Sequence, residues 1–348
     1  MAFEYISDTG EIVPGQWFSD VGRLKEVADE TGRRSPEAPS SIIGRDVISI
    51  LLQGRGADRK LTGLPPLLAT PGARLFVHRP ERRAVVRLNS DGQTQFAKIV
   101  PPDRVNGLVE NCAALERLAG RSFAIPRLLD ADIRRGVTVW SALAGTSLHD
   151  LPHEAGYLDA SFAAGRALRN LHDLPLPEGI GRHMATAEVA VVENWMRMLR
   201  EYVPQWADQV AVQAARVVKR LMTAQTPARL LHRDFYDKQI FWDGGGQIGL
   251  LDFDTLTAGE AALDVANALA HFELRALMGD VSFVHSQAAS GTFLEGYAPD
   301  QEILDRLPAY QDASTLRLLC VYAFRPTSWK MLPAMLASLN QGMTIPVE

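Results

Sequence analysis

The sequence predicts an α+β protein with two parts, a small β-rich part followed by a larger, mainly helical part. Three observations support this prediction. Short β-rich segments separated by tight turns fill residues 74–100, and helical periodicity dominates from residue 146 onward. One short β-rich stretch, residues 230–253, interrupts the helices. An order of strands first and helices later is typical of an α+β architecture.

The β-rich part is expected to form an antiparallel meander, because its strand-forming segments are short and polar turns separate them. Three strands are expected over residues 74–78, 83–88 and 95–100, with turns at 79–82 and 89–92. A helix is expected over residues 105–119, where apolar side chains recur at helical spacing. Two further strands are expected at 125–129 and 137–140.

The remaining sequence favours helices, including segments at 191–203 and 210–222 and from residue 262 onward. We divide the sequence into three regions: an N-terminal extension with no assigned role, a β-rich lobe and a helical lobe. They cover residues 1–68, 69–143 and 144–348. The extension is expected to contain a helix at about 21–30.

Composition bounds the class of protein. Hydrophobic residues make up 47% and charged residues 22% of the 348 residues, as in soluble globular proteins. The two cysteines, Cys112 and Cys320, form no C-x-x-C pair, so neither a disulfide framework nor a zinc site is expected. The start lacks a secretory signal pattern, and no apolar run is long enough to span a membrane. We therefore expect a cytoplasmic protein that has no membrane segment.

Charge is distributed unevenly along the chain. Residues 1–140 carry 20 Lys+Arg against 17 Asp+Glu, and residues 141–348 carry 16 against 24, for a net charge of −5. This balance disfavours nucleic-acid binding through a broad basic surface. A mildly basic first part suits an anionic nucleotide, and an acidic second part suits a polar or cationic acceptor.

The most informative segment is the run HRDFYDKQ, residues 232–239. Two strand-like segments joined by a glycine-rich turn come after it and predict a β-hairpin that ends just before Asp252. A loop that enters one strand and a residue that leaves the other lie at the same edge of a hairpin. The sequence therefore places Asp234, Gln239 and Asp252 at one edge.

These three side chains have the chemistry for phosphoryl transfer. Two carboxylates and one amide oxygen are hard ligands of the kind that Mg²⁺ prefers, and nucleotide phosphates complete its coordination. One carboxylate remains available to orient an acceptor hydroxyl and take its proton. Phosphoryl transfer requires little beyond this positioning and the neutralisation of charge.

The pattern resembles the aminoglycoside phosphotransferase and choline kinase group, small-molecule relatives of the protein kinases. The resemblance covers about residues 74–275 and implies a bilobal protein kinase-like fold. It implies that Asp234 is the catalytic base and that Asp252, with Gln239, binds Mg²⁺ beside ATP or GTP. His232 is expected to brace the loop, and Asp264 to cap the following helix.

Gln239 departs from the group, which usually has Asn at this position. Gln offers the same oxygen on a longer arm, so metal binding remains plausible while its geometry changes. The maltokinase-like sugar kinases of this group also have Gln here, which favours a sugar-like acceptor.

The same resemblance identifies candidate nucleotide contacts in the β-rich lobe. Lys98, on the third strand, fits the lysine that holds the α- and β-phosphates. Glu110 is the preferred ion-pair partner on the following helix, with Glu116 as the alternative. Ala142 and Leu143 are expected to form the hinge that contacts the adenine edge.

The sequence thus predicts an ATP- or GTP-dependent kinase that phosphorylates a hydroxyl of a small molecule, such as an aminoglycoside, an amino sugar or another sugar-like acceptor. The alternative is a nucleotide-binding pseudokinase that acts as a regulatory or scaffold module, which Gln239 leaves open. The oligomeric state does not follow from the sequence.

Overall fold

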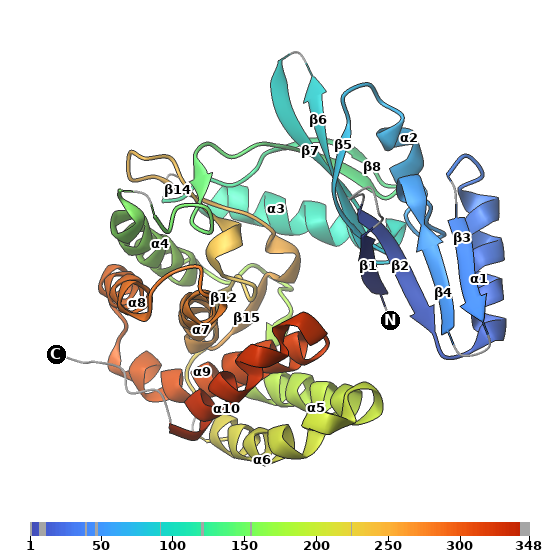
Figure 1. Ribbon diagram of the computed structural model, residues 1–348. Helices are drawn as coiled ribbons and strands as arrows, with labels where there is room; N and C mark the ends of the chain where they lie inside the picture. The colour runs from blue at the N-terminus through green and yellow to red at the C-terminus, as the bar shows by residue number, and fades with distance from the viewer. Residues whose placement is uncertain are drawn as a thin grey trace. The chain divides into compact units, whose positions relative to one another are not determined.

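The computed structural model divides the chain into two compact units (Figure 1). It describes residues 2–6, 12–38, 40–45, 48–90, 92–119, 122–153, 155–223 and 225–341. The first unit comprises residues 1–113 and 126–142, and the second comprises residues 114–125 and 143–348. The first unit is rich in antiparallel strands and the second is mainly helical, so the α+β class predicted from the sequence is confirmed.

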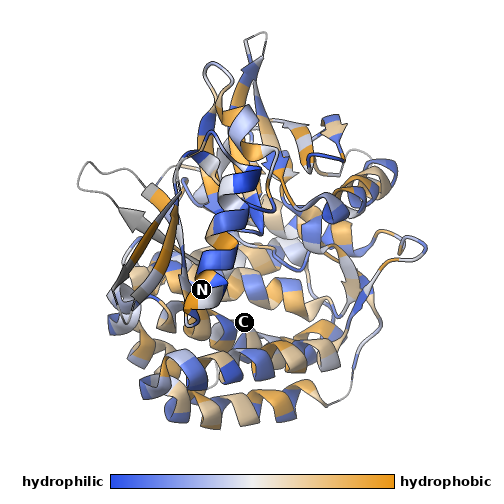
Figure 2. Cartoon of the chain, turned by 90° about the vertical axis from the view of Figure 1, so that its right-hand side faces the viewer, coloured by the Kyte–Doolittle hydropathy of each residue, from blue (hydrophilic) through white to orange (hydrophobic). Residues whose placement is uncertain are grey.

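The N-terminal part of the first unit is an antiparallel sheet with a helix on one face. Its strands are β1 (Ala2–Ile6), β2 (Ile12–Phe18), β3 (Ser40–Arg45) and β4 (Ile48–Gln53), in the order β1-β2-β4-β3. Helix α1 (Val21–Arg34) includes the expected helix and packs Leu24 and Val27 against Leu51 of β4. Its outer face is mainly polar, as Figure 2 shows. None of these strands was expected from the sequence patterns.

A five-stranded antiparallel sheet forms the rest of the first unit. Its strands are β5 (Arg74–Arg79), β6 (Arg83–Ser90), β7 (Gln93–Ile99), β8 (Leu128–Asp132) and β9 (Val137–Ser141), in the order β5-β6-β7-β9-β8. Helix α2 (Leu64–Leu68) and Leu61 cover one face, against Ala84 and Ile99. Two 3-10 turns, η1 (Gly54–Gly56) and η2 (Pro102–Arg104), complete the part. Helix α3 (Val105–Ala119) begins in the first unit, and its residues from 114 onward belong to the second.

The meander and the helix at 105–119 agree with the sequence prediction, with two differences. The strand expected at 125–129 lies at 128–132 instead. Pro126 has no N–H and restricts the residue before it, so a regular ladder starts only beyond it. Asp91, in the predicted turn 89–92, lies outside the described residues.

The second unit has seven helices in its described part, with short strands among them. The helices are α4 (Tyr157–His172), α5 (Ala185–Tyr202), α6 (Pro204–Leu221), α7 (Ala262–Met278), α8 (Phe283–Tyr297), α9 (Gln301–Ala323) and α10 (Leu332–Gln341). The strands are β10 (Thr146–Ser147), β11 (Arg182–His183), β12 (Arg229–Leu231), β13 (Ile240–Trp242), β14 (Ile248–Leu250) and β15 (Thr257–Gly259). Three 3-10 turns complete it: η3 (Asp237–Gln239), η4 (Phe253–Thr255) and η5 (Pro326–Met331).

Helix α7 is the centre of the second unit, and every residue from Ala262 to Ala276 is buried or half-buried. It packs against α8 and α9, as seen in Figure 1. Beside it, α4 and α8 approach closely at a pair of glycines. A Cβ on Gly165 would lie 2.1 Å from the carbonyl oxygen of Phe293, and one on Gly296 would lie 2.0 Å from that of Phe162. No helix among the described residues has both the length and the apolar character needed to cross a membrane.

Candidate active site

The predicted hairpin is present, and the segment that enters it and the segment that leaves it meet at one edge. Strands β13 and β14 pair antiparallel, with Ile240 opposite Leu250. The pairing continues one residue further, because the N–H of Leu251 donates to the carbonyl oxygen of Gln239 at 2.9 Å. Asp252 is the next residue, so Gln239 and Asp252 lie at the same edge of the hairpin.

Asp264 holds the loop that carries Asp234. The two carboxylate oxygens of Asp264 accept the backbone N–H groups of His232 and Arg233, each at 2.7 Å. The expectation that Asp264 caps a helix is therefore wrong. The N-cap of α7 is Ala261, which makes no side-chain capping bond, and the Asp264 carboxylate bonds instead to the loop that follows β12. A fully buried carboxylate needs strong donors, and the strained loop supplies them.

Two residues of this site have left-handed backbone conformations that L side chains rarely adopt. The φ angle is 68° at Arg233 and 62° at Asp252. Such a conformation costs on the order of 1–3 kcal/mol and persists only where the surroundings enforce it. Asp264 accepts a hydrogen bond from the N–H of Arg233. His232 Nε2 forms a hydrogen bond with the carbonyl oxygen of Leu251, the residue before Asp252, at 2.7 Å. His232 therefore does brace the loop by hydrogen bonding.

A buried polar chain lies behind the loop. His172 Nε2 is 3.2 Å from Asp264 Oδ2, and His172 Nδ1 is 2.8 Å from the Tyr297 hydroxyl. All three side chains are buried. His172 is the last residue of α4, and its contact with Asp264 spans 92 residues of sequence, so it could not be predicted from local pattern.

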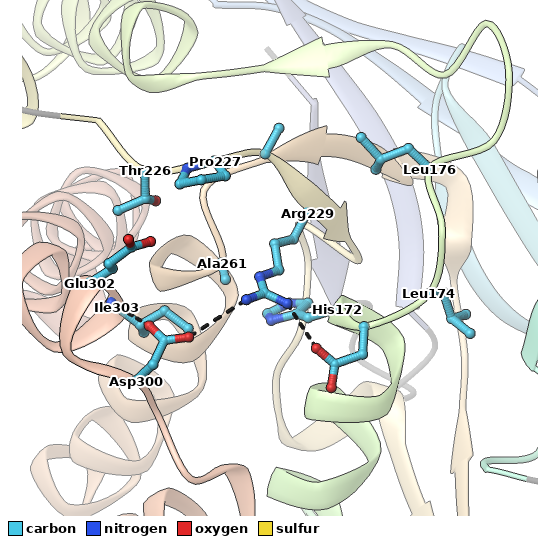
Figure 3. Close-up of a pocket in the computed structure, with 12 residues that line it drawn as sticks. His172, Leu174, Leu176, Thr226, Pro227, Arg229, Ala261, Asp300, Glu302 and Ile303 are labelled. Atoms are coloured by element: carbon cyan, nitrogen blue, oxygen red, sulfur yellow. Dashed lines mark hydrogen bonds and ion pairs between the residues drawn. The ribbon is translucent and has the colours of Figure 1, made fainter.

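His172 also lines a polar depression, which encloses about 650 Å³ including open solvent. The Arg229 guanidinium pairs with the carboxylate of Asp173 at 2.8 Å and with that of Asp300 at 3.6 Å, and Figure 3 shows it extending toward Asp300. Neither Asp234 nor Asp252 lines this depression. The depression is therefore lined by none of the site residues predicted from the sequence.

The predicted residues of the second unit surround the side chain of Tyr236. Gln239 Nε2 donates to the Tyr236 hydroxyl at 3.4 Å. Burial raises the pKa of Tyr236, and the negative charges of Asp234 and Asp252 raise it further. The Tyr236 hydroxyl is thus protonated at neutral pH, and the carboxylates of Asp234 and Asp252 both influence it electrostatically.

The side of α7 that faces the loop carries groups that the sequence did not single out as site residues. His271 stacks on Tyr236, with ring centroids 4.4 Å apart. Burial and the nearby Arg317 lower the pKa of His271 to about 3, so its ring is neutral. Asn267 donates to the carbonyl oxygen of Phe235 at 2.9 Å and accepts a hydrogen bond from Arg317.

Asp237 forms a second charged cluster at the loop. Its Oδ2 is 2.7 Å from His149 Nδ1 and 3.2 Å from the Arg275 guanidinium, which also contacts His149. Burial raises the pKa of Asp237, but the hydrogen bond from His149 and smaller electrostatic contributions of its neighbours outweigh burial and leave the pKa lowered. These contacts anchor Asp237, in η3, to His149 and Arg275.

The donor set at the hairpin edge fits a magnesium ion. The amide of Gln239 turns its nitrogen to Tyr236, which leaves the amide oxygen as the free end. That oxygen and the Asp252 carboxylate are both hard ligands. When bound, Mg²⁺ would neutralise charge on the nucleotide phosphates.

The candidate nucleotide contacts lie in the first unit or at its boundary. Lys98 is half-buried on β7, opposite Val85 of β6 and Thr138 of β9. Glu110 is exposed on α3. The chain passes from the first unit to the second between Ala142 and Leu143. The roles assigned to Lys98, Glu110, Ala142 and Leu143 stay predictions.

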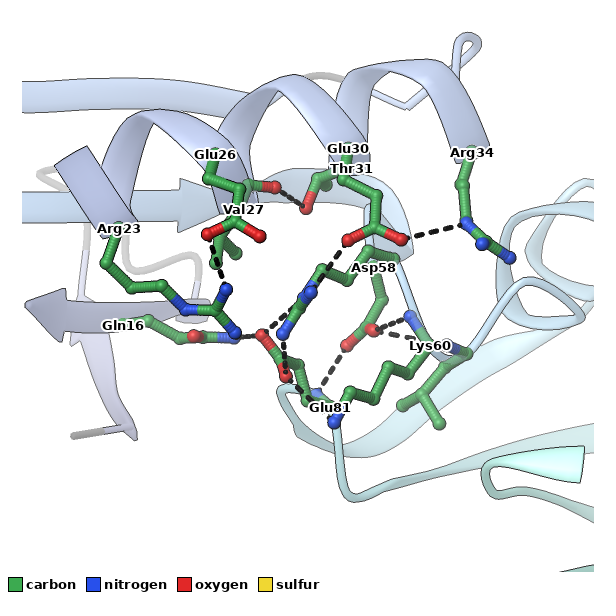
Figure 4. A network of polar contacts seen from close by, with 12 residues as sticks. Gln16, Arg23, Glu26, Val27, Glu30, Thr31, Arg34, Asp58, Lys60 and Glu81 are labelled. Atoms are coloured by element: carbon green, nitrogen blue, oxygen red, sulfur yellow. Dashed lines mark hydrogen bonds and ion pairs between the residues drawn. The ribbon is translucent and has the colours of Figure 1, made fainter. Parts of the chain in front are cut away.

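The turn between β5 and β6 is held by a polar network within the first unit (Figure 4). Asp58 is fully buried, and its Oδ2 accepts the N–H of Glu81 at 2.8 Å and contacts His78 Nε2 at 3.0 Å. The Arg59 guanidinium pairs twice with Glu81, at 2.9 Å each, and reaches Glu30 of α1 at 2.7 Å. The turn is therefore fixed to α1 and to the connector after β4.

Comparison with known proteins identifies solved structures that share the fold. Spectinomycin phosphotransferase APH(9)-Ia, solved with ADP and spectinomycin, is 13% identical over 77% of this chain and 93% of its own, with a TM-score of 0.57. Amicoumacin kinase hAmiN is 15% identical over 79% and 90%, with a TM-score of 0.58. A choline/ethanolamine kinase family protein from Mesorhizobium loti is 17% identical over 82% and 93%, with a TM-score of 0.54. No curated protein matches the sequence.

The fold and the loop together define a small-molecule phosphotransferase with a protein kinase-like architecture. Residues 73–303 match the model of the phosphotransferase enzyme family, and the chain belongs to that family. The family recognised from residues 232–252 is thereby confirmed, whereas the maltokinase-like detail at Gln239 stays a prediction.

Proposed function

We propose that the protein transfers the γ-phosphate of ATP or GTP to a hydroxyl group of an aminoglycoside, an amino sugar or another sugar-like molecule. The observation that supports this most strongly is the arrangement of Asp234, Gln239 and Asp252 around Tyr236, on a loop that Asp264 locks. Solved structures of the same fold contain spectinomycin with ADP and amicoumacin with AMP-PNP and Ca²⁺.

Each residue has one role in this proposal. Asp234 accepts the proton of the acceptor hydroxyl while the hydroxyl oxygen bonds to the γ-phosphorus, and the bond from that phosphorus to the nucleoside diphosphate breaks. Gln239 and Asp252 hold Mg²⁺. Lys98, paired with Glu110, holds the α- and β-phosphates, and Ala142 and Leu143 contact the base.

The test is nucleoside diphosphate release with Mg²⁺ and ATP or GTP across a panel of aminoglycosides, amino sugars, disaccharides and amino alcohols. We expect turnover with at least one acceptor class, and we expect Asp234→Asn to lower it about 10²- to 10⁴-fold, because the general base is lost. Asp243→Asn is the matched control, since this Asp is exposed in the hairpin turn.

The outcomes separate the alternatives. Turnover that survives in Asp234→Asn would remove the proposed base. Nucleotide binding with no turnover on any acceptor would favour the pseudokinase.

We also propose a cytoplasmic location, which is supported by the two cysteines, both buried and free of disulfides.

A further inference from the structure

Gln239 has one more methylene than the Asn that the phosphotransferase pattern usually has here, so its amide has an additional rotatable bond. We propose that Tyr236 orients Gln239, by accepting a hydrogen bond from its amide nitrogen, so that the amide oxygen faces the metal. Tyr236 is thus a positioning residue for this chain's longer ligand. The inference rests on the proposed function, because it assumes that a metal–nucleotide complex binds at this edge.

The first step is the chemistry of the amide. Its oxygen can ligate a cation, whereas its NH₂ group has two donor hydrogens and cannot. An unrestrained Gln side chain could present either end to the metal. The bond from Gln239 Nε2 to the Tyr236 hydroxyl, at 3.4 Å, occupies the nitrogen and selects the oxygen. Gln239 is 8% exposed, so few other arrangements of its side chain are available.

The second step is the anchoring of Tyr236 itself. Its ring stacks on the neutral ring of His271, with centroids 4.4 Å apart. His271 lies one helical turn after Asn267 on α7, and Asn267 holds the carbonyl oxygen of Phe235 at 2.9 Å. The residue before Tyr236 and the Tyr236 ring are therefore both fixed to the central helix. A ring placed this firmly can fix the amide that bonds to it.

A short side chain would not need this support. An Asn at position 239 would keep the backbone position set by the Leu251 N–H but would withdraw its amide by one methylene. It could not reach a hydroxyl that the Gln amide contacts only at 3.4 Å. The proposal therefore predicts that the Tyr236 hydroxyl matters only when position 239 is Gln, which gives a direct test by a double-mutant cycle.

The experiment measures binding of AMP-PNP by calorimetry, with Mg²⁺ or Mn²⁺ and with EDTA. Four proteins are compared: wild type, Tyr236→Phe, Gln239→Asn and the double variant. Tyr236→Phe keeps the ring and its stack, so the fold should be retained, and thermal unfolding checks this. We expect Tyr236→Phe to weaken metal-dependent binding about three- to tenfold, a change of about 0.7–1.4 kcal/mol, and to leave binding in EDTA unchanged.

In the Gln239→Asn background we expect Tyr236→Phe to change metal-dependent binding less than twofold. Tyr202→Phe, which removes a hydroxyl from an exposed tyrosine at the end of α5, should behave as wild type. An equal loss in both backgrounds would overturn the proposal, as would no loss in the Gln239 background or an equal loss in EDTA. If wild type binds AMP-PNP no more tightly with metal than with EDTA, the proposed function itself fails and the inference fails with it.

Discussion

In each of the two units, a buried aspartate stabilises a turn by accepting a backbone N–H group from it. In the second unit, the buried Asp264 accepts the N–H of Arg233, whose φ is 68°, and contacts His172 Nε2. In the first unit, the buried Asp58 accepts the N–H of Glu81, whose φ is 60°, and contacts His78 Nε2. Each carboxylate thus stabilises a non-glycine residue that has a left-handed backbone conformation. Each also contacts the Nε2 atom of a histidine.

The surroundings of the two carboxylates differ. Asp264 is on the central helix α7, and behind it His172 continues to the buried Tyr297. Asp58 is on a connector, and the turn that it holds is reinforced by the ion pairs of Arg59 with Glu81 and Glu30. The comparison shows that a strained turn held by a buried Asp does not by itself identify catalytic chemistry. The chemistry that we propose at the second turn depends on the next residue along the chain, Asp234.

Replacing Asp264 should have the largest effect. Asp264→Ala leaves the N–H groups of His232 and Arg233 and the ring of His172 without their acceptor, and each buried group costs about 1–3 kcal/mol. After relaxation, we expect a loss of roughly 3–5 kcal/mol in the free energy of unfolding and at least a 100-fold loss of turnover. Chemical denaturation and the phosphotransfer assay measure the two effects. Asp208→Ala, at an exposed position on α6, is the control, and a loss no larger than its loss would contradict the role of Asp264.

Replacing Asp58 should have a smaller and more local effect. Its carboxylate accepts the N–H groups of Lys60, Leu61 and Glu81 and contacts His78. Because two of these donors belong to a connector that can open to water, we expect about 2–4 kcal/mol of destabilisation.

Hydrogen exchange locates the effect of Asp58→Ala. Protection should fall at residues 58–61 and 78–83 and stay unchanged at 231–235. Asp103→Ala, exposed in η2 of the first unit, is the control. Loss of protection at 231–235 would show that the two turns are not independently stabilised.

Replacing Arg59 sharpens the comparison further, because it removes the ion pairs and leaves Asp58 in place. The Arg59 and Glu81 side chains are only 11% and 18% exposed, and the contact between them is bidentate. We expect Arg59→Met to cost about 1–2 kcal/mol. Arg34→Met removes an exposed pair with Glu30 and should cost less than about 0.5 kcal/mol. Equal costs in denaturant unfolding would mean that burial adds nothing to the Arg59 contacts.

The parts of the site that could be predicted from the sequence are those encoded at short range. Asp234, Gln239 and Asp252 lie within 19 residues, and the hairpin pairing of Ile240 with Leu250 fixes their relation. The role of Asp264 could not be predicted, because an Asp in the first turn of a helix has the same local pattern whether it caps the helix or bonds to a loop. Its partner His172 is set by helix packing across 92 residues.

The N-terminal sheet could not be predicted for a similar reason. Strand β2 pairs on both sides although it contains Pro14 and Gly15, two residues that argue against an interior strand. A Cβ on Gly15 would lie 2.6 Å from the Phe3 ring, so the glycine makes room for the neighbouring strand. Such cross-strand fits depend on tertiary packing. The strand and helix at 95–100 and 105–119 were predictable because their periodicity is regular.

The smallest expected effect is at a carboxylate that lacks the backbone donors of Asp58 and Asp264. Burial raises the pKa of Glu273, although Ser338 donates to its Oε1 at 2.9 Å and opposes the shift. A folded-state pKa above the unfolded value means that the charged form costs stability, so the cost is absent below about pH 4 and grows as pH rises through the folded pKa.

Glu273→Gln keeps the oxygen for Ser338 and removes the charge. We expect a gain below about 1 kcal/mol at pH 7–8 that disappears near pH 4, measured by thermal unfolding across this range with the exposed Glu295→Gln as control. A gain that is the same at every pH would rule out ionisation of Glu273 as its cause.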